Sequence, residues 1–338
     1  MTSSMTSRRR ALVLAFSAAS IAAAAGAAHA QFTLGQQRAG TSSGAFLKIG
    51  VGARAVSLGE SFVAVANDPS AIYWNPAGLA SLQRQEIQFS HADWPADIRY
   101  EHGTWVVPSR RLGGSFAVQF GVLSTELDET SELHPFGTGR SFLYSDMLAG
   151  VAYARRWTDK LLVGFGLKYV REDLGSDVGG PVTSAGLVDM GSIYYLGYGS
   201  VRIAVSLTNF GPALTPGGNY TSPITGEVRN YDGFDPPIMF RYGVAFEPIE
   251  NAHQRLTTSL EVAQPADNAQ RIKFGAEWTW LHRLALRSGY DFNADEMKFA
   301  AGAGLFLGVG QKQGTIDYAF TDGGVLGAIN RLSLAVRF

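Results

Sequence analysis

In the stretch QRIKFGAEWTW, residues 270–280, apolar residues alternate with charged, polar or glycine residues. Its even positions from Ile272 to Trp280 are apolar, whereas its odd positions from Arg271 to Thr279 are charged, polar or glycine. Side chains of a β-strand point alternately to opposite faces, while an α-helix would repeat every 3.6 residues. The stretch is therefore predicted to be a β-strand with one apolar face and one polar face.

The same two-residue period recurs from residue 86 to the C-terminus. Most of these segments have about 9–12 residues, close to the 9–11 that a tilted strand needs to cross a bilayer and longer than most soluble strands. The fold is therefore predicted to be all-β, a closed antiparallel transmembrane barrel. The count of fourteen segments agrees with this, because bacterial single-chain barrels have an even number of strands. The expected spans of the segments are 86–93, 98–107, 113–123, 142–157, 160–171, 184–196, 199–209, 238–248, 255–263, 269–280, 282–290, 297–308, 312–320 and 329–338.

The connections between these segments support a membrane barrel independently. Long connections, expected at 124–141, 172–183 and 210–237, alternate with tight ones such as 108–112 and 158–159. Outer-membrane barrels have short periplasmic turns and longer external loops. The long connections follow the third, fifth and seventh predicted strands and so lie at the same end of the barrel, the external one. The first strand is therefore predicted to begin, and the last strand to end, on the periplasmic side.

Composition excludes several other classes of protein. The 338 residues carry a formal net charge of −1, and 17% of them are charged, so no basic surface for nucleic acid is expected. The chain has no cysteine, which rules out disulfides and thiolate metal sites. Its six histidines lie far apart in the sequence, without the spacing of metal ligands. We predict neither a metal nor another cofactor.

Residues 1–30 are predicted to be a signal peptide. Arg8 to Arg10 give a basic start, residues 11–28 are uncharged and mostly apolar, and Ala28-His29-Ala30 fits the small-x-small cleavage pattern. A transmembrane helix is the alternative, but the run is mostly alanine and ends at the cleavage pattern. We expect cleavage near Ala30 and a multi-pass location in the bacterial outer membrane, residues 85–338 forming the barrel.

Residues 31–84 differ from the alternating strands and are predicted to form a plug in the lumen. Asp68 precedes Pro69 and Asn75 precedes Pro76; Asp and Asn cap helices, and proline fits the first helical position. The sequence predicts short helical turns at 69–73 and 76–82. We expect the segment to fill the periplasmic half of the barrel.

The segment resembles the PorV/PorQ family of outer-membrane proteins and, more distantly, the FadL family of transporters for hydrophobic compounds. The resemblance rests on residues 52–55, on Gly59 with residues 62–66, on Asp68 and on YWNPAGLA at 73–80. It implies a fourteen-stranded barrel whose N-terminal plug holds the Asn-Pro-Ala motif. The candidate plug-motif residues are Gly52, Arg54, Gly59, Asp68, Pro69, Trp74, Asn75, Pro76 and Gly78.

The two faces of the strands predict which side chains meet lipid and which line the lumen. Lipid contact is expected for Phe165, Leu167, Phe274, Trp278, Leu334 and Val336. The expected lumen-facing charges are Lys168, Arg202, Arg241, Glu261, Arg271, Lys273, Glu277 and Asp317. Because an unpaired buried guanidinium is costly, Arg54 should pair with one of the carboxylates Glu261, Glu277 and Asp317.

The last strand ends in an aromatic residue at the C-terminus. Leu334, Val336 and Phe338 alternate along it and resemble the signal that the barrel-assembly machinery of the outer membrane reads. Outer-membrane lipid and this machinery are therefore the expected general partners.

Two functions follow from the resemblance. PorV-like proteins bind the C-terminal domains of cargo at the type IX secretion machinery, which implies a platform whose external loops contact cargo. FadL-like proteins instead imply a passive conduit for a hydrophobic small molecule. The longest connections, 124–141 and 210–237, are shorter than those of FadL-like transporters and contain no evident amphipathic helix, which favours the platform.

Two further classes fit the sequence poorly. A soluble periplasmic β-propeller should show a repeat of about 40 residues, and none is found. Gly40-Thr41-Ser42-Ser43-Gly44 fits the G-x-S-x-G pattern of hydrolases, but it lacks the preceding strand that this motif requires. We therefore predict that the protein is not an enzyme.

Overall fold

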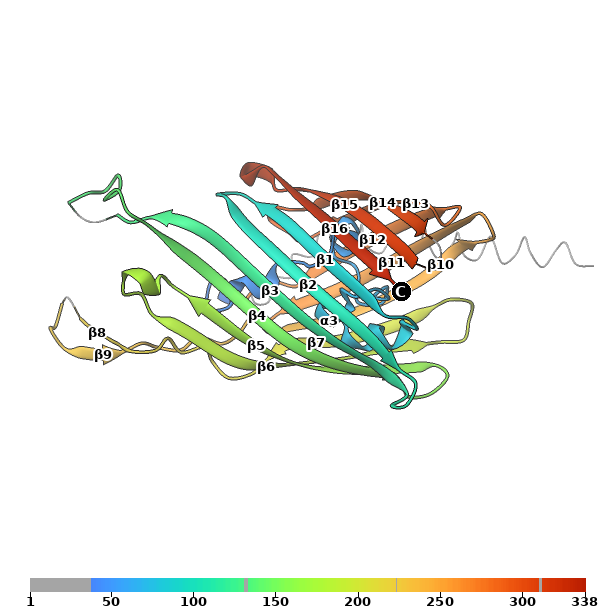
Figure 1. Cartoon of the computed structure of the whole chain (residues 1–338), viewed down its shortest axis with the longest axis horizontal. Helices are drawn as coiled ribbons and strands as arrows, with labels where there is room; N and C mark the ends of the chain where they lie inside the picture. The colour runs from blue at the N-terminus through green and yellow to red at the C-terminus, as the bar shows by residue number, and fades with distance from the viewer. Residues whose placement is uncertain (1–37, 131–132, 223, 310–311) are drawn as a thin grey trace, which may run out of the picture.

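The barrel is closed by strands that pair in chain order. A computed structural model describes residues 38–130, 133–222, 224–309 and 312–338. In these residues fourteen antiparallel strands form one closed barrel, whose ends meet where β1 pairs with β16 (Figure 1). The predicted fold class is confirmed. The barrel strands are β1 (Glu86–Trp94), β2 (Ile98–Ser109), β3 (Gly114–Asp128), β4 (Ser141–Arg156), β5 (Leu161–Asp173), β6 (Val182–Tyr195), β7 (Arg202–Phe210), β10 (Met239–Glu250), β11 (Gln254–Pro265), β12 (Arg271–Trp280), β13 (Leu284–Asp291), β14 (Phe299–Val309), β15 (Lys312–Asp322) and β16 (Ala328–Arg337).

Side chains alternate between the two faces of the wall as the sequence predicts. On β12, Lys273 and Glu277 are buried inside the barrel, while Trp278 is exposed on the outside. Of the six side chains expected to meet lipid, five are exposed and Phe274 is half-buried. A register error of one residue would have reversed these faces, so the predicted register is correct.

The two ends of the barrel differ in their connections. At the tight-turn end, residues 110–113, 157–160 and 281–283 join neighbouring strands. At the loop end, residues 129–140, 174–181 and 211–238 make longer connections, which project beyond the barrel in Figure 1. Four of the loop-end elements were not predicted: the 3-10 helices η4 (Ser176–Val178) and η5 (Gly324–Leu326), and the strands β8 (Asn219–Thr221) and β9 (Val228–Asn230), which form a separate hairpin.

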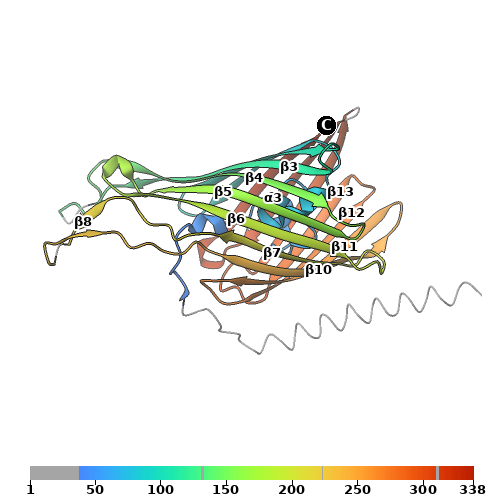
Figure 2. The same cartoon turned by 90° about the horizontal axis from the view of Figure 1, so that it is seen from below.

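Four short helices lie inside the barrel, and we call residues 41–85, which contain them, the plug (Figure 2). They are η2 (Ala45–Lys48), α2 (Ala53–Ser57), α3 (Ala71–Trp74) and η3 (Pro76–Ser81). Helix α2 packs against β13 to β16, whereas η3 packs against β3 to β6, so the plug joins opposite walls. No helix in the described part of the chain is long and apolar enough to cross a membrane.

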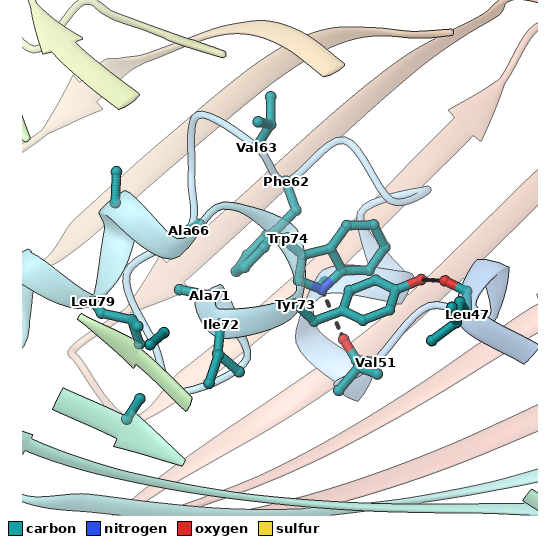
Figure 3. Packing of buried hydrophobic residues seen from close by; sticks show 14 of the residues in the cluster. Leu47, Val51, Phe62, Val63, Ala66, Ala71, Ile72, Tyr73, Trp74 and Leu79 are labelled. Atoms are coloured by element: carbon teal, nitrogen blue, oxygen red, sulfur yellow. Dashed lines mark hydrogen bonds between the residues drawn. The ribbon is translucent and has the colours of Figure 1, made fainter. Parts of the chain in front are cut away.

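The Asx-Pro pairs organise the second half of the plug. The Asn75 side chain accepts a hydrogen bond from Ala77 N at 3.1 Å, which caps η3, and Pro76 is the first helical residue. Asp68 Oδ1 accepts one from Ser70 N at 3.0 Å, and α3 begins two residues later than predicted, at Ala71. Buried hydrophobic side chains surround both turns (Figure 3). Asn75 therefore caps η3 as predicted, whereas α3 has Ser70 as its N-cap and no side-chain capping hydrogen bond, so the predicted cap by Asp68 is wrong. Burial stabilises both helices.

The plug extends further through the lumen than expected. Ser42 forms a β-bridge with Asp235, and Ser43 hydrogen-bonds Glu172, both at the loop end. At the tight-turn end, Gln85 accepts a hydrogen bond from Phe338 N at 2.9 Å. The expectation that the plug fills only the periplasmic half is therefore wrong. The predicted signal peptide, residues 1–30, and residues 31–37 lie outside the described residues.

Candidate functional site

Arg54 anchors the plug to the barrel wall. Of its three expected carboxylate partners, the structure pairs it with Glu277: Nε lies 2.8 Å from Oε2, and Nη2 lies 2.9 Å from Oε1. Its Nη1 is 3.0 Å from Asp68 of the plug itself. Burial alone would lower the pKa of Arg54, but attraction to Glu277 and Asp68 outweighs burial and raises that pKa. The guanidinium therefore stays charged.

The anchor continues along the wall as a chain of alternating charges. Glu277 also accepts a hydrogen bond from Arg287 Nε at 2.6 Å. Arg287 Nη1 donates in turn to Asp317 at 2.7 Å. Glu277 thus holds two guanidinium groups, the half-buried one of Arg54 from the plug and the buried one of Arg287 from the wall, and Asp317 forms a second ion pair with Arg287.

Other wall charges hold the plug through different groups. Lys273 Nζ is 2.6 Å from Glu60 Oε2. Glu261 accepts hydrogen bonds from the backbone N–H groups of Phe62 and Val63, at 2.9 and 2.8 Å. Burial would raise the pKa of Glu60, but Lys273 outweighs burial and lowers it. Predicted lumen charges therefore serve as attachment points for the plug.

The remaining predicted lumen charges also have partners of opposite sign. Lys168 lies 2.8 Å from Asp189, Arg202 lies 2.9 Å from Glu247, and Arg271 lies 3.5 Å from Asp291. Arg241 Cζ lies 5.3 Å from the centre of the Trp74 ring, and its Nε is 3.7 Å from Glu261. The described charges of the wall are thus largely neutralised within the barrel, which argues against a charge-selective pore.

The Asn-Pro-Ala motif packs tightly against the wall. Asn75 is fully buried, and its Nδ2 donates to Val63 O at 3.0 Å and to Ser192 O at 3.2 Å. A Cβ added to Gly78 would lie 2.2 Å from Ala66 O. Trp74 Nε1 donates to Val51 O at 2.9 Å (Figure 3). These contacts give the motif a role in folding the plug.

Two other plug-motif glycines lie where a side chain would not fit. Gly52 precedes α2 with φ 83°, and Gly59 has φ 62°. A Cβ on Gly59 would also lie 2.7 Å from the backbone N of Tyr290 on β13. Glycine is therefore needed there both for the backbone conformation and for the close approach to the wall.

Near the loop end, four apolar side chains lie on one inner side of the barrel, next to the buried carboxylates Asp146 and Glu172 of the same strands. Leu123, Leu148, Val170 and Leu187 lie on neighbouring strands β3 to β6, and each is buried on the inner face. Phe46 and Leu47 of η2 belong to the same cluster of buried hydrophobic residues. We call these six residues the apolar chamber.

Hydrogen bonds to two carboxylates hold η2 in the chamber. Glu172 accepts one from Ser43 Oγ at 2.6 Å and one from Gly44 N at 2.7 Å. Asp267 accepts one from Ser42 Oγ, and Lys48 Nζ lies 2.7 Å from Asp267 Oδ2. We call these six residues the latch. The sequence interpretation missed it, although Lys48, a cation among apolar residues, carries the same signal as Arg54.

Asp267 gives the latch a defined pH dependence. Burial would raise its pKa, but hydrogen bonds from Lys48 and Ser42 outweigh burial and hold the pKa below the ordinary 3.8. A carboxylate with a depressed pKa stabilises the latched state above its ordinary pKa, and this contribution is lost as the pH falls through the depressed value.

We expect amide hydrogen exchange at residues 43–48, corrected for intrinsic rates, to be equal at pH 7 and pH 5 and faster at pH 3. Asp267→Asn should show fast exchange already at pH 7. Acceleration of the wild-type protein between pH 7 and pH 5 would mean that another group controls the latch.

Comparisons with known proteins agree with the architecture. The model of an uncharacterised protein family (UPF0164) matches residues 17–151. No curated protein matches the chain. Among solved structures, the chain is similar to the toluene transporter TbuX of Ralstonia pickettii, with a TM-score of 0.53 and 12% identity over 85% of this chain and 97% of that chain.

Two further solved structures are similar over almost their whole length. The toluene transporter TodX of Pseudomonas putida has a TM-score of 0.52 and 14% identity over 79% of this chain and 92% of that chain. The monoaromatic hydrocarbon channel CymD has a TM-score of 0.55 and 12% identity over 85% of this chain and 96% of that chain. The chain therefore has the fold of FadL-like outer-membrane barrels.

Proposed function

We propose that the protein is an outer-membrane conduit for small hydrophobic molecules and that η2 blocks the path at rest. The apolar chamber carries this proposal, because buried leucine and valine side chains gather on the inner face of β3 to β6, between the Lys168–Asp189 pair and the carboxylates Asp146 and Glu172 nearer the loop end. A hydrophobic molecule entering from the loop end could replace Phe46 and Leu47 without exposing that apolar surface to water. The shared fold with hydrocarbon channels supports the same function.

The latch makes displacement of η2 feasible. It consists of hydrogen bonds and one ion pair near the rim, and the Lys48 side chain is 35% exposed. The Arg54 anchor lies deeper, with only 13% of its side chain exposed. We therefore infer that residues 41–48 move when a molecule passes, while the anchored part around Arg54 stays in place.

Influx into liposomes tests the conduit directly. Liposomes with lipopolysaccharide in the outer leaflet are needed, because a small neutral aromatic crosses a phospholipid bilayer unaided. In such liposomes, purified wild-type protein should admit toluene or a similar neutral aromatic probe faster than in protein-free controls, and should not admit a neutral sugar of similar size. Asp267→Ala should increase aromatic influx severalfold, because it removes the acceptor for both Ser42 and Lys48. Equal influx with and without wild-type protein would refute the conduit.

A secretion platform of PorV/PorQ type is the second candidate, and exposed apolar loop residues favour it. Leu133 and Phe136 in the β3–β4 loop are 87% and 102% exposed, and Ile224 in the β8–β9 hairpin is 93% exposed. Such side chains could contact the C-terminal domain of a cargo protein. In this case, deleting residues 133–138 or 219–230 should abolish cargo capture, and no hydrophobic probe should enter liposomes.

The membrane location of the barrel predicts a depth-dependent effect of charge. Phe165→Arg, on the outer face of β5, should destabilise the inserted barrel by about 2–4 kcal/mol, because arginine is costly in the bilayer interior. Phe136→Arg is the matched control, since this loop residue is fully exposed. Urea unfolding in vesicles measures both. Similar effects would place β5 outside the bilayer.

Export and insertion complete the proposal. We infer that residues 1–30 are removed and that the barrel-assembly machinery reads Leu334, Val336 and Phe338. Sequencing the N-terminus of the protein from outer membranes would test cleavage near Ala30. Replacing Phe338 by serine should lower barrel abundance in the membrane without changing synthesis.

A further inference from the structure

The tight-turn end carries a cluster of exposed cations on one side of the barrel. Two neighbouring turns hold it, residues 110–113 between β2 and β3 and residues 157–160 between β4 and β5. Its cations are Arg110, Arg111, Arg155, Arg156 and Lys160, all of which are exposed. We call these five residues the basic patch. Within the described residues, none of them forms a salt bridge with a carboxylate.

Contacts between β3 and β4 hold the two turns side by side. Gly114, which follows the first turn, pairs with Arg155 on β4. Tyr153 Oη donates a hydrogen bond to Leu112 O at 2.8 Å. Arg155 Cζ lies 5.1 Å from the ring centre of Trp157, which is 64% exposed. Arg156 Nη1 donates a hydrogen bond to Asp159 O at 3.0 Å. The patch thus combines cations that have no carboxylate partner among the described residues with an exposed indole on the rim of the barrel.

The opposite end of the same hairpin has the reverse charge. At the loop end of β3, Glu126 and Asp128 are exposed, and Glu129 follows them. Arg140 is the cation near them, 3.7 Å from Glu129. Since the whole chain has a net charge of only −1, the basic patch reflects an uneven distribution of charge along the barrel rather than a basic protein.

We propose that the basic patch binds the phosphate groups of anionic phospholipids in the leaflet at the tight-turn end. Arginine side chains offer planar, bidentate donors to phosphate oxygens, and cations close to an anionic leaflet gain from its negative potential. Exposed tryptophan is typical of the boundary between lipid and water. The inference rests on the proposed membrane location but not on the conduit.

Lipid titration of the purified protein tests the site. Phosphatidylglycerol and phosphatidylcholine with identical acyl chains are added to the protein in neutral detergent at low ionic strength, and native mass spectrometry counts the bound lipids. Wild-type protein should bind phosphatidylglycerol preferentially. The variant R110Q/R111Q/R155Q/K160Q should bind it at least tenfold more weakly, since each cation near an anionic surface contributes about a fivefold gain.

The control removes four cations elsewhere at the same end. R84Q/R255Q/R283Q/K312Q has the same change in net charge. Arg255, Arg283 and Lys312 lie within the segment from β11 to β15, away from the β2–β5 turns, and Arg84 belongs to the end of the plug. This control should bind phosphatidylglycerol like wild-type protein. The variant R110K/R111K/R155K, which keeps the charge but loses the bidentate donors, should bind it more weakly than wild-type protein and more tightly than the glutamine variant. Heat-modifiable migration on gels shows that each variant folds.

The outcomes separate the lipid site from the conduit. Equal phosphatidylglycerol binding by wild-type protein and the patch variant would overturn the proposal and would indicate an acidic protein as the partner of the patch. Equal losses in the patch variant and the matched control would also overturn it, because only total charge would then matter. Preferential binding by a wild-type protein that admits no aromatic probe would support the lipid site while refuting the conduit.

Discussion

Glu277→Ala is expected to destabilise the folded barrel by about 3–5 kcal/mol, because it leaves buried charges without their partner. Arg54 loses a bidentate partner, and Arg287 keeps only Asp317. The Glu277 side chain is 2% exposed, so water cannot replace the lost carboxylate without opening the plug. Urea unfolding of the protein in vesicles, followed by tryptophan fluorescence, measures the change.

Glu250→Ala is the matched control for this prediction. Glu250 ends β10 at the tight-turn end and is exposed, so its removal should change the unfolding free energy by less than about 0.5 kcal/mol. Glu277→Gln keeps the size of the side chain and should fall between the two variants. A Glu277→Ala midpoint equal to that of Glu250→Ala would mean that the anchor does not stabilise the protein.

A disulfide between residues 42 and 235 is expected to abolish influx of the aromatic probe. Ser42 and Asp235 form a parallel β-bridge between the plug and the β9–β10 connection, and bridge partners lie within the range that a disulfide spans. The chain has no natural cysteine, so S42C/D235C can form only this intramolecular bond. The bond would hold η2 in the apolar chamber.

Reduction should restore influx to the wild-type rate or above it, because S42C also removes one hydrogen bond to Asp267. The single variants S42C and D235C control for the substitutions and should conduct in both redox states. If the oxidised double variant conducts like wild-type protein, the molecule passes without displacing η2. This result would refute the proposal that η2 blocks the conduit at rest.

The strands of the barrel wall could be predicted from the sequence because the two-residue hydrophobic period recurs along each of them. Along β12, polar and apolar residues alternate, and this alternation shows which face of the wall each side chain occupies. Strand positions and register could therefore both be predicted. The partner of Arg54 could be narrowed to three carboxylates by charge alone, and Glu277 was among them. Periodicity and the cost of unpaired charge therefore account for these successes.

The latch could not be predicted in the same way. Residues 40–44 have no period, and their small side chains fit many paths. Ser42 and Asp267 are 225 positions apart, and Ser43 and Glu172 are 129 apart, so no local pattern connects them. The β8–β9 hairpin was missed because its strands have only three residues each. These features depend on the closed barrel, which brings distant carboxylates to one rim.

The course of the plug through the lumen determines an order of assembly. Ala53 N donates to Ser333 Oγ at 2.8 Å, and Ser333 Oγ lies 3.1 Å from Ser90 Oγ, so the plug touches the seam where β1 meets β16. Residues at that seam, such as Glu86 and Arg337, are 251 positions apart, which makes its formation slow. Since the plug contacts both strands of the seam, we expect residues 53–85 to lie against the open sheet before β16 pairs with β1. Closure of the seam would then enclose this part of the plug.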